Sequence, residues 1–398
     1  MAAGAMRSAS ETALLLRLAR VVKGGDSTLI DMPCCIRVSA SSKSSELSVG
    51  ATRLDAAMGT TTDKATNHRI RHGLEYVSVV CVACVMRMLP RGWALELGAG
   101  IGRLGWWLRI RRGLVLRNLE QALPELDSQS RNALAALAAR NFGRTVAEFL
   151  RFAGRDRERV SELVDIDGLD ELGDVLAQGQ GAVIVTAHQG AWALYVTALA
   201  AAGVPATLLV GVQHNRRVDE LILGIPGDSI RFVSKGKSSP RELLTSLKEG
   251  RVLVMVADHY SSDQQVMVPF LGRPAYTLPL PGALVAKYDL PVFRMLGHRV
   301  SHGRHRMGLS RLPIEHASLP EETQAGAAAV TGENEIKLGV ARAMNASLGQ
   351  GILERPDQYF WYHDRWKQRS YRKGPKLDDS TPVSITSPSH PAPPPIES

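Results

Sequence analysis

The hydrophobic and polar positions of this chain follow two different periods, and the changes of period define the predicted elements. Between residues 164 and 257, short apolar runs rich in β-branched residues alternate with segments in which apolar residues recur every three to four positions. The runs predict buried strands and the periodic segments predict amphipathic helices. The predicted strands are 164–168, 182–186, 206–212, 230–233 and 252–257, and the predicted helices are 169–176, 191–202, 216–223 and 240–249. This order predicts an α/β fold, a mixed, mainly parallel sheet flanked by helices.

Helical patterns also flank this central region. Helices are predicted at 74–89, 93–108 and 128–153 before it, and at 281–288 and 333–353 after it. Between the last two, a strand at 291–296 begins a hairpin, and Pro269-Phe-Leu-Gly-Arg-Pro is expected to be a loop. His298, His302 and His305 straddle the hairpin and are expected to be exposed, because no acid or cysteine accompanies them as a ligand set would require.

Changes in composition predict four segments. Residues 1–66 are rich in Ala, Ser, Thr and Gly without sustained periodicity, and residues 371–398 form a tail rich in Pro and Ser, so both are expected to be disordered. Residues 67–112 are expected to be membrane-associated helices and residues 113–370 the α/β domain. The amino-terminal segment lacks the pattern of a secretory signal, which places the main domain in the cytoplasm.

The amino-terminal helices predict peripheral contact with an anionic membrane surface. The apolar run before Arg87 is shorter than the roughly twenty residues that span a bilayer. Indole rings beside guanidinium groups suit the headgroup layer. The residues concerned are Trp106, Trp107, Arg109, Arg111, Arg112 and Arg117. The alternative is a helix hairpin in the core with a solvated basic edge.

The net charge indicates the kind of partner, and the cysteine content indicates whether disulfides or a metal site are expected. Lys and Arg outnumber Asp and Glu by 48 to 39, giving a net charge of +9, which favours an anionic partner. The four cysteines all lie in the first quarter of the chain, so no disulfide framework holds the main domain. Cys81 and Cys84 have C-x-x-C spacing, but no second pair or nearby histidine completes a site, and no metal is expected.

One glycine-rich stretch favours a competing function. Leu95-Glu-Leu-Gly-Ala-Gly-Ile-Gly102, with Glu120 further on, is similar to the cofactor loop of an S-adenosylmethionine-dependent methyltransferase. That loop must follow a buried strand, and the preceding Pro90-Arg-Gly-Trp93 is a poor strand. Considered as a helix, the stretch places Gly98, Gly102 and Gly105 on one smooth face, which favours close packing against another helix or lipid.

His188 is the leading candidate for catalysis. It follows the predicted strand 182–186, and in open α/β sheets the chemistry gathers at the carboxyl ends of the strands. An imidazole at this place can act as a general base, or simply cap the helix that follows.

Five blocks, in order, resemble the bacterial lipid A late acyltransferases, within the wider lysophospholipid acyltransferase group. The blocks are Arg117–Glu125, Thr186–Trp192, Ala257–Tyr260, Val268–Thr277 and Glu354–Lys367. The resemblance implies an acyltransferase fold and transfer of a fatty acyl chain from acyl carrier protein or coenzyme A to a hydroxyl of a glycolipid or lysophospholipid. It implies a place at the cytoplasmic face of the cell inner membrane, no further cofactor and no nucleic-acid partner.

The resemblance also assigns site residues, with two departures. The family pairs its histidine with an acid five positions later, where this chain has Ala193, and a basic residue common in the family is replaced near Gly211. Asp258 is the expected substitute acid for His188. The expected substrate-binding residues are Gly190, Trp192, Asn215, Phe270, Gly272, Arg273 and Thr277. Because of Ala193, a catalytically impaired relative that binds lipid is the second hypothesis.

Overall fold

The computed structural model describes residues 61–152, 156–211, 230–234, 239–259, 266–314 and 327–367. Within these residues seven strands form one sheet in the order β1-β9-β8-β2-β5-β3-β4. The strands are β1 (Val164–Asp167), β2 (Val183–Thr186), β3 (Ala206–Val210), β4 (Ile230–Ser234), β5 (Val252–Val256), β8 (Val292–Arg299) and β9 (His305–Arg311). Neighbouring strands run parallel except β8 and β9, which form an antiparallel hairpin. The predicted α/β fold with a mixed, mainly parallel sheet is confirmed.

The core lies on both faces of this sheet because successive side chains of a strand point in opposite directions. All four residues of β2 are buried. Ile184 belongs to one apolar cluster, with α8 and α5, whereas Val183 and Val185 belong to the other, with α12 and α11. Two-sided burial explains why β2 reads as a continuous apolar run.

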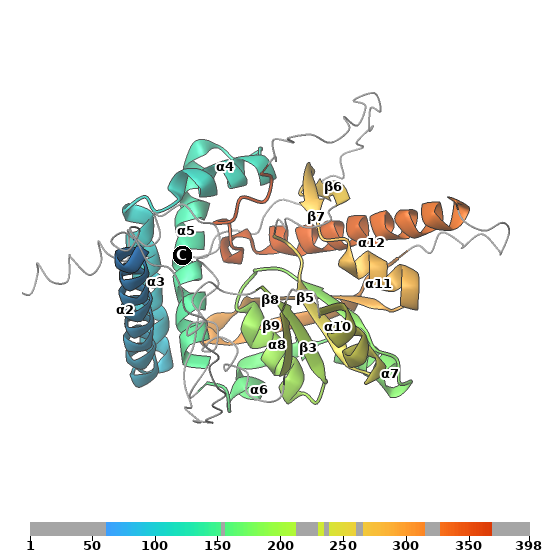
Figure 1. Ribbon diagram of the computed structural model, residues 1–398. Coiled ribbons are helices and arrows are strands. Elements are labelled where there is room, and N and C mark those ends of the chain that lie inside the picture. Colours follow the sequence, from blue (N-terminus) through green and yellow to red (C-terminus); the bar gives the residue numbers. More distant parts are fainter. Residues whose placement is uncertain are drawn as a thin grey trace, which may run out of the picture.

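Helices cover both faces of the sheet, and three long ones stack at one side (Figure 1). In that stack α2 (Thr61–Met88) and α3 (Arg91–Trp107) lie beside α5 (Ser128–Phe152). The remaining helices are α4 (Arg112–Ala122), α6 (Val160–Leu163), α7 (Leu169–Ala177), α8 (Trp192–Ala201), α10 (Ser239–Lys248), α11 (Leu280–Tyr288) and α12 (Ala327–Glu354), with 3₁₀ turns η2 (Ser301–Gly303) and η3 (Pro356–Gln358). None of the helices in the described residues has both the length and the apolar character needed to cross a bilayer.

Close contact between α3 and α5 depends on glycine. A Cβ at Gly98 or Gly102 would overlap the carbonyl of Gly143 or of Ala139 on α5, and one at Gly143 would overlap Gly98. The predicted smooth face is therefore confirmed at Gly98 and Gly102. The glycine-rich stretch lies inside α3 and follows no strand, so it is not a methyltransferase cofactor loop.

Replacing Gly102 with Ala is expected to destabilise the protein by about 1–3 kcal/mol, because the methyl group forces two packed backbones apart. Gly100 is the matched control, since a Cβ there meets nothing within 4 Å on the same helix. Gly100→Ala is expected to stabilise the protein by about 0.5–1 kcal/mol. Urea unfolding followed by tryptophan fluorescence measures both. Equal effects would show that α3 and α5 do not pack through this glycine face.

Two expectations from the sequence are wrong. The Pro269 to Pro274 stretch is not a loop: β6 (Val266–Phe270) and β7 (Arg273–Thr277) form an antiparallel hairpin, closed by Leu271 and Gly272, which both have positive φ. His305 is not exposed but fully buried. It shares the inner face of β9 with Met307 and Leu309, so the alternation along that strand carries it into the core.

Three expectations fall partly or wholly outside the described residues. These are the disordered segments 1–66 and 371–398 and the helix 216–223. Of the first segment, residues 61–66 are described, and they form the first turns of α2.

Candidate active site

The register of the sheet brings His188 and Asp258 together. Strands β2 and β5 are parallel neighbours in which Val183 pairs with Leu253 and Thr186 with Val256. His188 and Asp258 each lie two residues beyond the carboxyl end of their strand, with the same separation along the sequence as every pair in the ladder. The two parallel strands therefore place an imidazole and a carboxylate next to each other beyond their carboxyl ends.

The two side chains form a hydrogen-bonded pair. The Nδ1 atom of His188 lies 2.9 Å from Oδ1 of Asp258, and the backbone amide of His188 donates to Oδ2 at 3.1 Å. Asp258 is completely buried, whereas the His188 side chain keeps 14% of its surface exposed. The carboxylate therefore fixes one edge of the ring and leaves Nε2 on the side away from it.

The surroundings keep Asp258 ionised. Burial alone would raise the pKa of this carboxyl group, but the attraction of His188 and His259 and the hydrogen bonds from His188 lower it below the ordinary value. Tyr359 also hydrogen-bonds the carboxylate, and burial together with that negative charge raises the pKa of its phenol well above 10. The acid partner thus remains a carboxylate at neutral pH.

Aromatic rings enclose the imidazole. The ring of His259 stacks on that of His188 with centroids 3.6 Å apart and planes within 7°, and the ring of His363 stacks on His259 at 4.0 Å and 11°. Trp192 meets His188 edge-on at 5.4 Å, and Phe360 lies tilted at 6.1 Å. The imidazole of His188 is therefore the first of three stacked rings, followed by His259 and His363.

The same groups lie close enough to be considered as metal ligands. Ligand atoms of His188, Asp258 and His259 lie within 4.8 Å of one another. However, the in-plane lone pairs of two rings stacked face to face run parallel and do not converge on one ion, and Nδ1 of His188 already faces the carboxylate. The geometry favours an acid–base dyad over a metal centre.

The turn after His188 is held by its own backbone amides. The amide of Gln189 donates to the Ala187 carbonyl, that of Gly190 to the Gln358 carbonyl, and that of Ala191 to the Tyr195 hydroxyl. Gly190 has φ +55°, and a Cβ there would overlap the Tyr195 hydroxyl, so glycine is required. The amides of Trp192 and Ala193 follow directly, in the first turn of α8.

Not all of the substrate-binding residues predicted from the sequence lie near His188. Gly190 and Trp192 lie beside His188. Phe270 and Thr277 are buried in the core, where Phe270 carries the Arg365 guanidinium on its face and Thr277 accepts hydrogen bonds from Asn345 and Arg365.

Gly272 lies in the β6–β7 turn, and Arg273 begins β7, where its Nε atom donates to the Gln121 carbonyl. Asn215 lies outside the described residues. Ala193 occupies the first turn of α8. The substrate-binding roles remain predictions.

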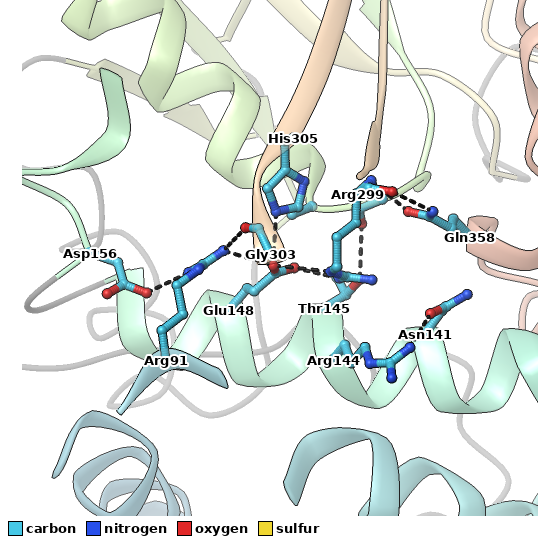
Figure 2. Close-up of polar contacts among 12 residues, drawn as sticks. Arg91, Asn141, Arg144, Thr145, Glu148, Asp156, Arg299, Gly303, His305 and Gln358 are labelled. Atoms are coloured by element: carbon cyan, nitrogen blue, oxygen red, sulfur yellow. Dashed lines mark hydrogen bonds and ion pairs between the residues drawn. The ribbon is translucent and has the colours of Figure 1, made fainter. Parts of the chain in front are cut away.

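The sequence analysis missed a buried ionic network behind the active-site turn (Figure 2). Glu148 of α5 is 2% exposed and accepts hydrogen bonds from Arg299 at 2.5 and 3.1 Å and from Arg91 at 2.9 Å. His305 lies 2.8 Å from Glu148 through Nε2 and 3.0 Å from the Tyr195 hydroxyl through Nδ1. The network therefore connects α3, α5 and the β8–β9 hairpin to the turn that follows His188.

Comparison with known proteins shows the family to which the chain belongs. A model of the bacterial lipid A biosynthesis acyltransferase family matches residues 63–368. The chain is 24% identical over 307 residues to a lipid A biosynthesis lauroyltransferase of Escherichia coli (strain K12), covering 75% of this chain and 93% of the relative. It is 22% identical over 290 residues to a lipid A biosynthesis palmitoleoyltransferase of the same organism, covering 69% and 84%. Because the family match spans most of the chain, the protein belongs to the bacterial lipid A biosynthesis acyltransferase family.

Proposed function

We propose that this protein transfers a fatty acyl chain from an acyl carrier protein or coenzyme A thioester to a hydroxyl of a membrane glycolipid, with His188 as general base. The observation that carries the proposal is the His188–Asp258 pair at the carboxyl edge of the sheet. The family supports acyl transfer in lipid A biosynthesis, and the names of two relatives specify the transfer of lauroyl and palmitoleoyl groups.

The proposed reaction needs one proton transfer and no covalent enzyme intermediate. Nε2 of His188 takes the proton of the acceptor hydroxyl while its oxygen attacks the thioester carbonyl. Asp258 holds the Nδ1–H tautomer and stabilises the imidazolium that forms. The carbonyl π electrons move to oxygen and return as the carbon–sulfur bond breaks, and the imidazolium protonates the departing thiolate.

The oxyanion of this intermediate requires donors, and the structure limits the choice. The amides of Gln189 and Ala191 donate within the turn and the first turns of α8, and the amide of Gly190 donates to the Gln358 carbonyl. The amides of Trp192 and Ala193 remain near His188, at the positive end of α8. We assign the oxyanion to this first turn of α8.

The experiment is a direct assay of the purified full-length chain. Radiolabelled acyl carrier protein and coenzyme A thioesters of several chain lengths are incubated with lipid A precursors and lysophospholipids in mixed micelles. Labelled lipid that depends on His188 is the expected result, with His188→Ala as the background. Lipid binding without turnover would favour the alternative of a catalytically impaired relative, motivated by Ala193.

The exposed face of α3 supports peripheral attachment to a membrane surface, which the family suggests is the inner membrane. Trp93, Leu97, Ile101 and Trp107 are 41–74% exposed, and their spacing places them along one side of the helix. Arg103 and Arg109 are exposed on or just beyond the same helix, where anionic headgroups would meet them. Trp106, by contrast, packs partly against the core with the Arg112 guanidinium 4.7 Å from its ring. It is therefore less exposed than its neighbour Trp107.

Replacing Trp93 and Trp107 together with Ser is expected to weaken binding to anionic vesicles at least about 100-fold, because each buried aromatic side chain contributes roughly 1.5–3 kcal/mol and about 1.4 kcal/mol corresponds to a factor of ten. Sedimentation with phosphatidylglycerol vesicles measures the partition coefficient. Met267→Ser, at a residue of β6 that is 48% exposed, is the control and should bind like the parent chain. Unchanged sedimentation of the double variant would place the membrane contact elsewhere.

A further inference from the structure

We propose that His259 is a positioning residue for acyl transfer: its ring, stacked between His188 and His363, holds the plane of the catalytic imidazole. This rests on the proposed function, because it assigns His188 as the base. His259 does not touch substrate in this proposal and acts only through His188.

The hydrogen bond to Asp258 does not by itself prevent one motion of the His188 ring, and the stack with His259 opposes that motion. The hydrogen bond from Nδ1 to Asp258 fixes one edge of the ring but allows it to rock about that contact. The face of His259 lies parallel to His188 at a centroid distance of 3.6 Å, which is van der Waals contact, and Trp192 meets the ring edge-on at 5.4 Å. Rocking the ring by a large angle would break the stack or collide with it.

The far end of the stack is itself anchored. His363 lies 4.0 Å from His259, and its backbone carbonyl accepts a hydrogen bond from Asn118 at 2.6 Å. The same Asn118 amide, which is buried on α4, also donates to the Trp361 carbonyl. Arg111 donates to the carbonyl of Tyr362 between them. His259 is therefore held between a catalytic ring and a pinned segment.

The stack also concentrates the positive charge of the reaction on one ring. The charged groups that face it are Asp258, Arg365 and Arg111. Burial, then the neighbouring His188, lowers the pKa of His259 well below its ordinary value. Burial is also the main cause that lowers the pKa of His363 to about 4. His259 and His363 are both neutral at neutral pH. The proton taken from the acceptor therefore resides on His188, where the Asp258 carboxylate stabilises the positive charge.

Two substitutions separate stacking from other roles of His259. His259→Phe keeps a flat ring without nitrogens, and His259→Leu removes the flat face while remaining apolar. Because a displacement of about 1 Å in a reacting group can cost about 100-fold in rate, we expect His259→Leu to lower kcat by about 10- to 100-fold with KM for the acyl donor unchanged. His259→Phe should remain within about threefold of the parent chain by the same reasoning.

A second measurement needs neither donor nor acceptor. The ¹⁵N chemical shifts of the labelled His188 ring report its tautomer, and a single Nδ1–H form is expected in the parent chain and in His259→Phe. In His259→Leu we expect averaged shifts from mixed tautomers. If no chain shows acyl transfer but these spectra differ as expected, the proposed function fails and the positioning role stands.

Two outcomes overturn the inference. A folded His259→Leu protein with the parent kcat and a single His188 tautomer shows that Asp258 alone positions the ring. A His259→Phe protein as impaired as His259→Leu shows that the nitrogens of His259 matter and not its face. Far-ultraviolet circular dichroism confirms that each variant is folded before it is compared.

Discussion

The Asp258→Asn protein is expected to transfer acyl chains about 10⁴-fold more slowly than the parent chain, the loss that follows the equivalent change in serine proteases. An amide in place of the carboxylate accepts only one of the two hydrogen bonds that His188 now donates, from its ring and its backbone. It also carries no charge to stabilise the imidazolium. The effect should appear in kcat, because Asp258 is completely buried and reaches no substrate.

Initial rates of the Asp258→Asn protein at saturating acyl donor measure this loss. Asp170→Asn, at an exposed residue of α7, is the matched control and should not change the rate. Combining Asp258→Asn with His188→Ala should cost no more than His188→Ala alone, since the two groups act as a unit. A loss of less than about tenfold in Asp258→Asn would show that another acid serves His188 and would refute this dyad.

His188 was predicted from its place at the end of a strand, and Asp258 from its match to an acid of the family. His188 and Asp258 each follow a short apolar run that could only be a buried strand, and parallel neighbours bring the carboxyl ends of their strands to one edge. The resemblance placed the acid partner of the histidine at the position of Ala193 and offered Asp258, which matches another acid of the family, as its substitute. The structure shows that the carboxylate reaches His188 from the adjacent strand, so the first turn of α8 needs no acid to complete a pair.

The stacked imidazoles could not be predicted in the same way. His363 lies more than a hundred positions beyond His259, in a segment without regular structure, and is held there by Asn118 of α4. The hydrophobic periodicity of the sequence gives no sign of a contact between the end of β5, the distant segment that contains His363, and α4. The block containing His363 resembled the family, but the resemblance gave it no role.

His305 shows why burial was misjudged in the hairpin. The side-chain alternation of β9 places His305 with Met307 and Leu309, and that signal was present in the sequence. It was outweighed by the expectation that an ionisable residue avoids the core unless it is paired. Its partners, Glu148 and Tyr195, lie more than a hundred residues earlier, so the pairing that permits burial was not visible.

Glu148 is the centre of the second prediction, because two arginines and His305 share it as a partner. Arg91 and Arg299 keep only 14% and 8% of their side-chain surface, and both bond this one carboxylate. Burial alone would raise the pKa of Glu148, but Arg299 and His305 lower it well below the ordinary value. The network crosses between α3, α5 and the β8–β9 hairpin, so the packing of all three depends on it (Figure 2).

Replacing Glu148 with Gln is expected to destabilise the protein by about 3–5 kcal/mol, because it leaves the buried Arg299 guanidinium without its counter-charge. Arg91 keeps a second buried partner, Asp156. Glu96→Gln is the control: Glu96 pairs with Arg144 but is 65% exposed, and the loss should stay below about 1 kcal/mol. Urea unfolding at pH 7 measures both. Since the pKa of Glu148 is lower in the folded than in the unfolded chain, its contribution is present above the ordinary value of 4.5 and is lost as the pH falls below it. The difference in stability between the parent chain and Glu148→Gln should therefore shrink in acid, and a difference that stays constant from pH 7 to pH 3 would show that the charge of Glu148 is not its source.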